Sequence, residues 1–418
     1  MSGKRGNGEG SIYPYKNGFA AYVWVTTPDG KKKRKYVYGK TREDVHDKWI
    51  RLHAEAKKGP VDTKSPTIAQ YLAYWLKEVV EPDLRPKAAE TYAMHVRLYL
   101  TPGLGSKRLD KLSVRDVRTW INQLQIQCQC CAQGKDAARP RVDKNPARRQ
   151  RCCAIGRCCK QTVSRRTVQD ARTVLRSALS NAMREELVSK NVASLVQVRS
   201  AAVPKSKPKP WSVEEARTFL EAARAAGDPL YPAYVLALVL GLRRGEVLGL
   251  TWDSVNLDAG EITVEQQLQR VAGRLVHGET KTKASTAVLP LPDICVTALQ
   301  LRRKAQEAAK QAAGELWTDS GFVFTTRCGT PIEPRNFNRE FAARSAKAGV
   351  RRIRLHETRR ICGSLLAALD VHPRIAMQIL RHSKIAITME IYTYVPSAST
   401  RKAMRKLGEH LGNQADPA

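Results

Sequence analysis

The spacing of apolar residues divides the chain into a short strand-rich start and a long, mainly helical remainder. Residues 11–39 alternate between apolar and polar side chains, with turn signals at 17–18 and 28–30, as strands with one solvated face do. Thr41 then stands where a helix N-cap belongs, since its hydroxyl can accept a hydrogen bond from the first helical turn. The pattern predicts a small β-β-β-α domain over residues 1–60.

Apolar residues at helical spacing fill residues 66–199. Ser113 and Asp116 form a capping box, in which each side chain bonds the backbone of the other residue. The predicted helices cover 67–81, 86–100, 114–126 and 161–188. Because these stretches carry apolar stripes, we expect them to pack together as an all-helical domain.

Strand and helix patterns mix in residues 211–405, after a linker at 200–210 that is rich in Pro and Lys. Helices are predicted at 213–226, 229–240, 291–313 and 373–380, and short strands at 261–264, 266–271 and 287–290. The chain is therefore predicted to be multidomain and mainly α, with a mixed α+β domain here and a C-terminal tail at 406–418.

The charge balance indicates a polyanionic partner. Among 418 residues, 72 are Lys or Arg and 39 are Asp or Glu, which gives a formal net charge of +33. Basic residues occur in every region, so nucleic acid is expected well ahead of an anionic membrane surface. No apolar run approaches the length of a membrane span, and the first residues lack the apolar core of a signal peptide. We therefore expect an intracellular protein with no membrane partner and with reduced or metal-bound cysteines.

One strand pair of the N-terminal domain is dense in both aromatic and basic side chains. The aromatic residues are Tyr22, Trp24, Tyr36 and Tyr38. The basic residues are Lys31, Lys32, Lys33, Arg34 and Lys35. A two-stranded ribbon fits the major groove of DNA, so we predict that these basic residues contact DNA. The alternative is that the aromatic residues fill one side of a thin sheet while the basic residues only solvate it.

Seven of the ten cysteines lie in one basic stretch, residues 128–159, which is poor in apolar residues. They form two clusters, and the segment between the clusters cannot build a hydrophobic core of its own. Thiolates that close such a loop suggest structural zinc. The spacing favours four ligands: Cys128, Cys131, Cys153 and Cys158. Two alternatives stay open, a disordered basic insertion with free thiols and intramolecular disulfides.

Residues 355–395 combine side chains that are suited to phosphodiester chemistry. His356 and Arg359 are three residues apart and would share one face of a helix, where they could bind one anion from two directions. His382 follows a predicted helix, and Tyr392 follows ten residues after His382. A tyrosine hydroxyl beside such groups can act as a nucleophile.

This stretch resembles the catalytic box of the tyrosine recombinases, and of phage and mobile-element integrases in particular. The family carries His-x-x-Arg, a Gly-His pair and a Tyr about ten residues later. Here these places hold His356 and Arg359, then Arg381 and His382, then Tyr392. The family often ends in Tyr-x-His and often has a His where Arg360 stands here. Its Gly is replaced by Arg381, which needs another way to end the preceding helix and could add a phosphate contact.

Two further family residues have counterparts upstream. An Arg in a Gly-Leu-Arg turn corresponds to Arg243, although the neighbouring Arg244 could exchange roles with it. A Lys on a β-hairpin corresponds to Lys281, with Lys283 as the alternative.

The resemblance implies a role for each of these residues. Arg243 and Arg359 would clamp the non-bridging oxygens of the scissile phosphate, and His382 would donate a hydrogen bond to one of them. Tyr392 would be the nucleophile, with Tyr394 as its competitor. His356 would be the general base, and Lys281 would protonate the departing 5′ oxygen.

The same resemblance implies a site-specific DNA recombinase that integrates or excises a mobile element through a 3′-phosphotyrosine intermediate, with no cofactor for catalysis. Residues 1–60 would be an arm-type DNA-binding domain, 66–199 a helical core-binding domain and 211–405 a tyrosine-recombinase catalytic domain. We expect double-stranded attachment sites, a homotetramer on DNA, a host or directionality factor, and a place in the bacterial cytoplasm at the nucleoid. A type IB topoisomerase and a catalytically inactive DNA-binding regulator are the alternatives.

Overall fold

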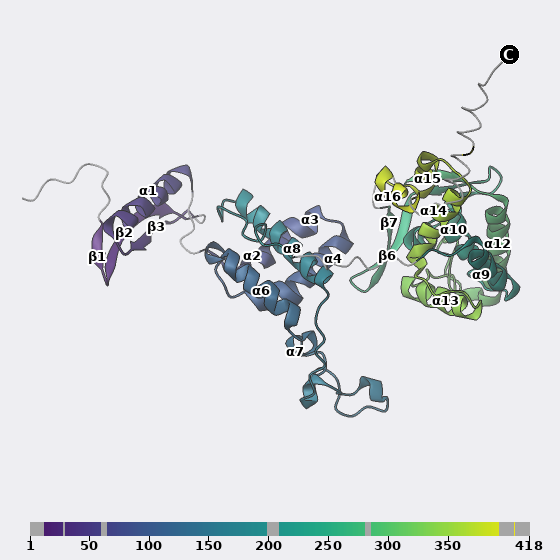
Figure 1. Cartoon of the computed structure of the whole chain (residues 1–418), viewed down its shortest axis with the longest axis horizontal. Helices are drawn as coiled ribbons and strands as arrows, with labels where there is room; N and C mark the ends of the chain where they lie inside the picture. Colours follow the sequence, from purple (N-terminus) through teal and green to yellow (C-terminus); the bar gives the residue numbers. More distant parts are fainter. Residues whose placement is uncertain are drawn as a thin grey trace, which may run out of the picture. The chain divides into compact units, whose positions relative to one another are not determined.

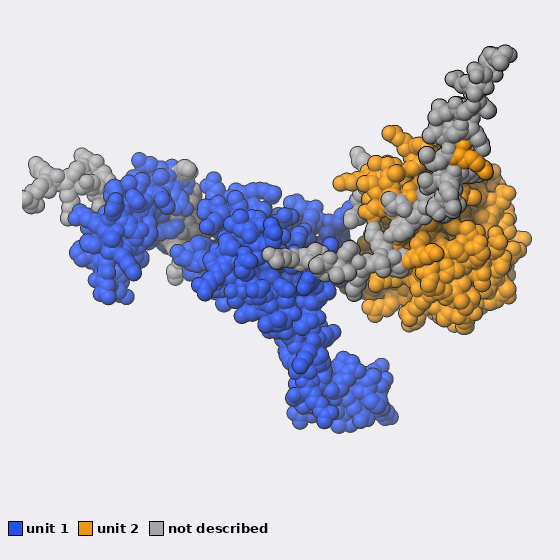
Figure 2. Space-filling model, viewed as in Figure 1, with its two compact units in different colours: residues 1–204 blue, residues 205–418 orange. Residues whose placement is uncertain are grey.

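The computed structural model describes residues 12–27, 30–59, 65–198, 209–280, 286–392 and 405 (Figure 1). The chain divides into two compact units, Met1–Pro204 and Lys205–Ala418 (Figure 2). No helix among the described residues is both long and apolar enough to cross a bilayer.

The first unit begins with the predicted β-β-β-α arrangement. Strands β1 (Tyr13–Tyr15), β2 (Gly18–Thr26) and β3 (Lys32–Gly39) form one antiparallel sheet in the order β1-β2-β3. Helix α1 (Arg42–Lys58) covers one face, and the hydroxyl of Thr41 accepts the amide hydrogen of Asp44 as the N-cap. A small apolar cluster of Val23, Val25 and Leu52 holds the helix against the sheet.

A helical domain with its own hydrophobic core follows. Its first two predicted helices are each interrupted by a π-helical turn. The elements are α2 (Ile68–Trp75), a π-helix (Leu76–Val80), α3 (Glu81–Asp83), α4 (Pro86–His95), a π-helix (Val96–Leu100), α5 (Thr101–Leu104), a 3₁₀-helix (Leu109–Lys111), α6 (Val114–Ile126), α7 (Gln129–Ala132) and α8 (Arg165–Arg184). The predicted capping box of Ser113 and Asp116 is present.

The cysteine-rich segment between α7 and α8 extends away from the helical core of its own domain (Figure 1). Its regular structure beyond α7 is limited to two 3₁₀ turns, Pro146–Arg148 and Cys153–Ile155. The segment is therefore shaped by polar contacts rather than by regular secondary structure.

The second unit is the predicted mixed α+β domain, and α10 lies at the centre of its core. Its helices are α9 (Val213–Ala225), α10 (Tyr231–Val239), α11 (Arg244–Gly249), α12 (Asp293–Ala313), α13 (Pro334–Lys347), α14 (Thr358–Ala368), α15 (Pro373–Leu380) and α16 (Ile385–Tyr392), with 3₁₀ turns at Trp252–Ser254, Gly314–Leu316 and Leu355–Glu357. Strands β4 (Val255–Asn256), β5 (Glu261–Val264) and β8 (Ala287–Pro290) form one antiparallel sheet, and β6 (Gln266–Val271) pairs with β7 (Arg274–Glu279) as a hairpin.

Candidate active site

The site is built around a tight turn between α10 and α11. Gly241 takes a positive φ of 60°, and a Cβ there would lie 2.8 Å from a methyl carbon of Leu380. Only glycine meets both conditions without strain. The turn places Arg243 at the N-cap of α11, directly beside the elements that carry the C-terminal residues.

A buried carboxylate, Glu246, holds two guanidinium groups. Its Oε1 accepts from Arg243 Nη1 at 2.6 Å, and its Oε2 accepts from Arg381 Nη2 at 2.6 Å. The Arg243 backbone amide also donates to Oε2, at 2.8 Å. The side chains of Glu246 and Arg381 are 2% and 1% exposed, whereas that of Arg243 is 36% exposed. Arg243 is therefore partly exposed, whereas Arg381 is enclosed.

Arg381 ends α15 in the left-handed conformation, with φ 50° and ψ 49°. Glycine adopts this conformation at lower cost, so a non-glycine residue here needs a compensating contact. The buried ion pair with Glu246 is that contact. The expectation that Arg381 adds a phosphate contact does not fit this burial, because its guanidinium is directed to Glu246 instead. Arg381 is a positioning residue in this structure.

Arg359 lies on α14 and is buried, and its Nη1 donates to the carbonyl oxygen of Gly241 at 2.9 Å. Its Nη2 has no hydrogen-bond partner within the described part of the chain. Burial, with Arg243 and Arg381 nearby, lowers the pKa of Arg359 to about 9. The group still carries its charge at neutral pH, with one donor unused.

The two predicted histidines lie beside these cations. Burial, followed by the charges of Arg359 and Arg243, lowers the pKa of His382 to about 4 and also lowers that of His356. His382 Nδ1 lies 2.9 Å from the hydroxyl of the buried Thr388. A neutral His382 ring can therefore carry its proton on Nε2 and donate it to an anion.

The placement of His356 differs from the sequence expectation. It lies in the 3₁₀ turn Leu355–Glu357, while Arg359 lies in α14, so the two residues do not share one continuous α-helical face. They nevertheless lie close enough for the charge of Arg359 to lower the pKa of His356.

Tyr392 is at the end of α16 and is not hydrogen-bonded to those predicted catalytic residues that the structure describes. Its hydroxyl donates to the carbonyl oxygen of Val371 at 2.5 Å. Its ring packs against a small cluster of Cys362, Leu380 and Ile391. Burial raises the pKa of Tyr392. In this conformation the phenol is held and is not activated.

Two of the sequence assignments fall on residues that the structure does not describe. Lys281 and its alternative Lys283, which come between β7 and β8 in the sequence, lie outside the described residues. Tyr394, two residues after Tyr392, also lies outside them. Arg244 lies inside α11, one residue past the cap position that Arg243 occupies.

The chemistry of this pocket follows from its charges. Arg243 and Arg381 bind the carboxylate of Glu246, and Arg359 lies close enough to feel the charges of all three, so positive charge is in excess. Such an excess among partly buried groups suits an anion with several oxygens, such as a phosphodiester. Glu246 and Thr388 were not identified from the sequence; Glu246 follows Arg243 by three residues, which was the available signal.

In the N-terminal sheet, four of the five predicted DNA-contacting residues divide between two faces. Lys32 and Arg34 share the outer face with Trp24, Tyr36 and Tyr38, which are 54%, 42% and 51% exposed. The Arg34 guanidinium lies 4.8 Å from the ring centroids of both Tyr22 and Trp24. Lys33 and Lys35 pair with Val25 and Val23, on the face that α1 covers, and Lys31 precedes β3. The aromatic residues therefore form an exposed surface and do not fill a core.

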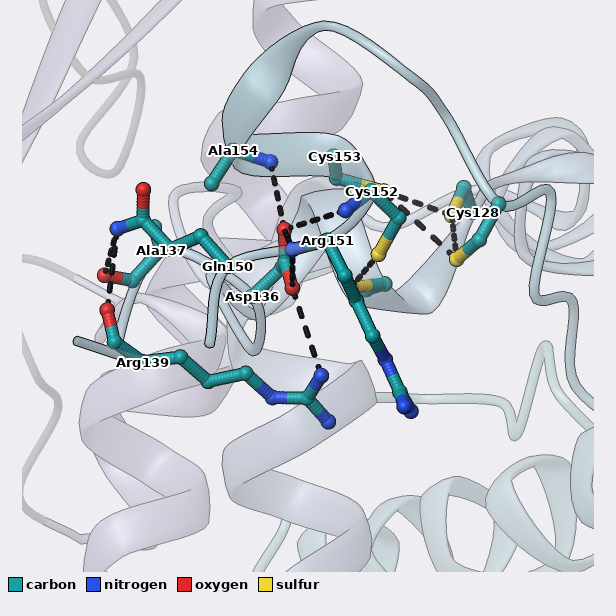
Figure 3. Close-up of polar contacts among 11 residues, drawn as sticks. Cys128, Asp136, Ala137, Arg139, Gln150, Arg151, Cys152, Cys153 and Ala154 are labelled. Atoms are coloured by element: carbon teal, nitrogen blue, oxygen red, sulfur yellow. Dashed lines mark hydrogen bonds and ion pairs between the residues drawn. The ribbon is translucent and has the colours of Figure 1, made fainter. Parts of the chain in front are cut away.

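The four predicted zinc ligands lie together. The Sγ atoms of Cys128, Cys131, Cys153 and Cys158 are all within 4.8 Å of one another. None of these cysteines forms a disulfide, and the loop that carries them has a defined conformation. Asp136 was not identified from the sequence; its buried carboxylate accepts amide hydrogens from Arg151, Cys152 and Ala154 (Figure 3).

Comparisons with known proteins agree with this geometry. Residues 209–398 match the phage integrase family, and residues 67–125 match the N-terminal SAM-like domain of phage integrases. An integrase of Saccharopolyspora erythraea is 23% identical, over 96% of this chain and 96% of that protein. A tyrosine recombinase XerC-like protein of Caldanaerobacter subterraneus subsp. tengcongensis is 25% identical, over 94% of this chain and 97% of that protein.

The solved structure of the Tn1549 transposon integrase in complex with transposon right end DNA shares the fold. The TM-score is 0.61 at 18% identity, over 82% of this chain and 99% of that one. Both the helical domain and the catalytic domain match phage integrases in sequence, and the relatives extend over nearly the whole chain. The chain belongs to the phage integrase family of tyrosine recombinases.

Proposed function

We propose that this chain is a site-specific recombinase that integrates or excises a mobile element by cleaving and rejoining DNA at Tyr392. The observation that carries the proposal is the cationic pocket formed by Arg243, Arg359 and His382. Arg243 is partly exposed, Arg359 Nη2 has no partner among the described residues, and His382 can donate from Nε2. These groups can bind two non-bridging oxygens of one phosphate, and these oxygens gain charge when a nucleophile attacks the phosphorus.

The reaction is a pair of phosphoryl transfers. The Tyr392 oxygen attacks phosphorus and loses its proton to His356; a 3′-phosphotyrosine bond forms and the bond to the 5′ oxygen breaks. Lys281 gives that oxygen its proton. In the second transfer a 5′ hydroxyl attacks the same phosphorus and releases Tyr392. Because the phosphotyrosine link keeps the energy of the broken bond, rejoining needs no nucleotide.

Attack requires Tyr392 to leave the carbonyl of Val371. Its hydroxyl cannot donate there and also pass its proton to His356. This conformation is therefore a resting one, in which the Tyr392 phenol has a raised pKa and is hydrogen-bonded to the carbonyl of Val371. DNA bound by Arg243, Arg359 and His382 would place its scissile phosphate at the position that the Tyr392 hydroxyl must reach in order to attack.

The outer face of the N-terminal sheet is the proposed arm-type DNA contact. Lys32 and Arg34 stand on it among exposed aromatic rings, which suits insertion into a groove. Arg34→Ala should weaken binding to arm-site DNA more than Lys35→Ala, because Lys35 lies on the α1 face. Equal losses in a filter-binding titration at fixed salt would contradict this assignment.

Covalent trapping tests the main proposal. A duplex that spans the junction of the mobile element and its host, nicked beside the scissile phosphate, should trap the wild-type chain covalently. Tyr392→Phe should trap none, whereas the control Tyr394→Phe should trap as wild type does. Trapping that is lost with Tyr394→Phe and kept with Tyr392→Phe would overturn the assignment of the nucleophile.

The alternatives are outcomes of related assays. Strand exchange between two attachment sites excludes a topoisomerase, which only relaxes one duplex. Absence of any covalent complex with wild-type chain favours a catalytically inactive regulator. We further propose a homotetramer on the two duplexes, aided by a host or directionality factor, at the nucleoid in the bacterial cytoplasm. Sedimentation of the chain with paired sites should show four copies per synapse.

A further inference from the structure

The cysteine loop brings together all seven of its thiols, which is more than one zinc ion can use. Two groups of four are present, and the Sγ atoms within each group lie within 4.8 Å of one another. The first group is Cys128, Cys131, Cys153 and Cys158. The second group is Cys130, Cys152, Cys153 and Cys159. Cys153 is the member that both groups share.

The spacing of the sulfur atoms matches ligands around a metal. Zinc–sulfur bonds of about 2.3 Å in a tetrahedron put the sulfur atoms about 3.8 Å apart. The first group contains pairs at 3.9 Å, Cys128–Cys153, and 3.7 Å, Cys131–Cys158. The second contains pairs at 3.8 Å, Cys130–Cys152, and 3.7 Å, Cys153–Cys159. A disulfide would require about 2.05 Å.

Apolar packing does not stabilise the loop. The clusters of buried apolar residues do not include residues 131–160, and Val142 and Ile155 are 84% and 50% exposed. The structured end of the loop is instead held by Asp136, which is 1% exposed. Its carboxylate accepts amide hydrogens at 2.9 Å from Cys152 and at 3.1 Å from Ala154, on either side of Cys153 (Figure 3).

We propose that this loop binds two zinc ions in a binuclear cluster of seven thiolates, with Cys153 Sγ bridging the two metals. Each zinc is four-coordinate: it has three thiolates of its own and shares the fourth. Seven thiols lose their protons to solvent as two ions bind. Asp136 fixes the backbone on both sides of the bridging residue, as outer-sphere partners of metal ligands do.

The charge of the loop is consistent with this cluster. Two Zn²⁺ and seven thiolates sum to a charge of −3, which needs compensation from nearby cations. Residues 128–160 contain nine basic side chains and two acidic ones. The basic residues are Lys135, Arg139, Arg141, Lys144, Arg148, Arg149, Arg151, Arg157 and Lys160. A closed cluster would fix these cations on a defined surface of the helical domain.

Metal content separates this proposal from a single-zinc site. The full chain, expressed with zinc and dialysed against metal-free buffer, should contain two zinc ions per chain by elemental analysis and native mass spectrometry. Cys158 belongs only to the first group and Cys159 only to the second. Cys158→Ser and Cys159→Ser should therefore each lose no more than one ion. Cys153→Ser should weaken both sites. Cys328→Ser, an exposed cysteine outside the loop, should keep both ions.

One zinc per chain in the wild type, unchanged by Cys159→Ser, would overturn the binuclear cluster in favour of a single site. No zinc, bound iron with visible absorption, or disulfides found by peptide mapping would overturn the zinc assignment itself. Circular dichroism of every variant checks that the helices remain folded, so that a lost ion reports a lost ligand.

Cobalt tests the bridge itself. Chain loaded with Co²⁺ should show thiolate-to-metal charge transfer that rises up to two equivalents. Two ions that share a thiolate are magnetically coupled, so the paramagnetic resonance signal per cobalt should fall as the second equivalent binds. Strictly additive signals would show two independent sites and would contradict a bridging role for Cys153.

Discussion

The catalytic pocket and the cysteine loop gather reactive side chains in opposite ways. In the pocket, Gly241, Arg359 and Glu246 sit on elements whose apolar neighbours Leu242, Val247 and Ile361 are at least 98% buried. In the loop, the apolar residues Val142 and Ile155 are exposed, and the side chains that lie close together are the thiols. Around the catalytic residues, apolar packing fixes the positions of the polar groups. In the cysteine loop, contacts between polar groups and thiols must fix the path of the backbone.

The difference predicts how each region responds to loss of its ligand. A pocket that is shaped by a core keeps its geometry without DNA, although three cations repel one another within it. A loop that is shaped by thiols keeps its geometry only while something holds the thiols together. Variants and conditions that change ligand binding without changing apolar packing therefore test whether the two regions differ in this way.

Arg359→Lys should have the largest effect, and it should fall on activity alone. Lysine keeps a charge, but its single nitrogen lacks the planar fork with which a guanidinium places separate nitrogens at the carbonyl of Gly241 and at a phosphate oxygen. Strand cleavage on a nicked site should fall by about 100-fold or more. The thermal transition should change little. Arg217→Lys, on the exposed face of α9, should cleave as wild type does. Cleavage within about threefold of wild type would remove Arg359 from the phosphate clamp.

Glu246→Gln should mainly reduce stability. It leaves Arg381, with a side chain 1% exposed, without its carboxylate partner. Removing one partner of a buried pair typically costs about 3–5 kcal/mol. Urea unfolding followed by tryptophan fluorescence, to which the buried Trp211 of this domain contributes, should show that loss. The control Glu307→Gln, on an exposed position of α12, should lose less than about 0.5 kcal/mol. If both variants unfold alike, the pocket does not depend on the shared carboxylate.

Much of the fold could be predicted from the sequence because its signals are local. Helices Val114–Ile126 and Pro373–Leu380 lie where apolar spacing and capping residues put them. Strand β7 and helix α13 were missed. The polar strand RLVHGE shows no clear alternation, and the segment PRNFNREFAARSAK has few apolar residues. Its two phenylalanines, Phe337 and Phe341, are the buried stripe of α13.

The sequence identified the candidate residues of the site, but it did not identify the contacts that these residues make. Glu246 and Arg381 are 135 positions apart, so no spacing rule joins them, and only the fold does. The hydrogen bond from Tyr392 to Val371 and the anchoring of the cysteine loop by Asp136 are hidden for the same reason. Local spacing can identify which groups are available, but the contacts of each group depend on tertiary packing.

Chelation should affect the loop and leave the core intact. Removing zinc with phenanthroline should expose the backbone between the cysteine clusters to trypsin, with cleavage after Arg141, Arg148 or Arg149. Circular dichroism at 222 nm should stay within about 5% of its starting value, since the helices pack on a separate apolar core. Restored zinc should restore protection. Loss of most helical signal on chelation would show that the metal supports the bundle and would end the contrast between the two regions.

The smallest expected effect is a pH dependence in the pocket. His382 has an ordinary unfolded pKa of about 6.5, and burial with neighbouring Arg359, Arg243 and Arg381 lowers its folded pKa to about 4. Between these values the unfolded chain binds more protons than the folded chain, so stability falls as pH falls from about 6.5 to 4. Protection factors of the amides in α14 and α15, which are exchange rates corrected for the intrinsic effect of pH, should therefore fall on acidification in the wild type. In His382→Gln the fall over the same range should be smaller, because glutamine does not titrate. Identical acid profiles in the two chains would mean that the surrounding cations do not hold His382 neutral.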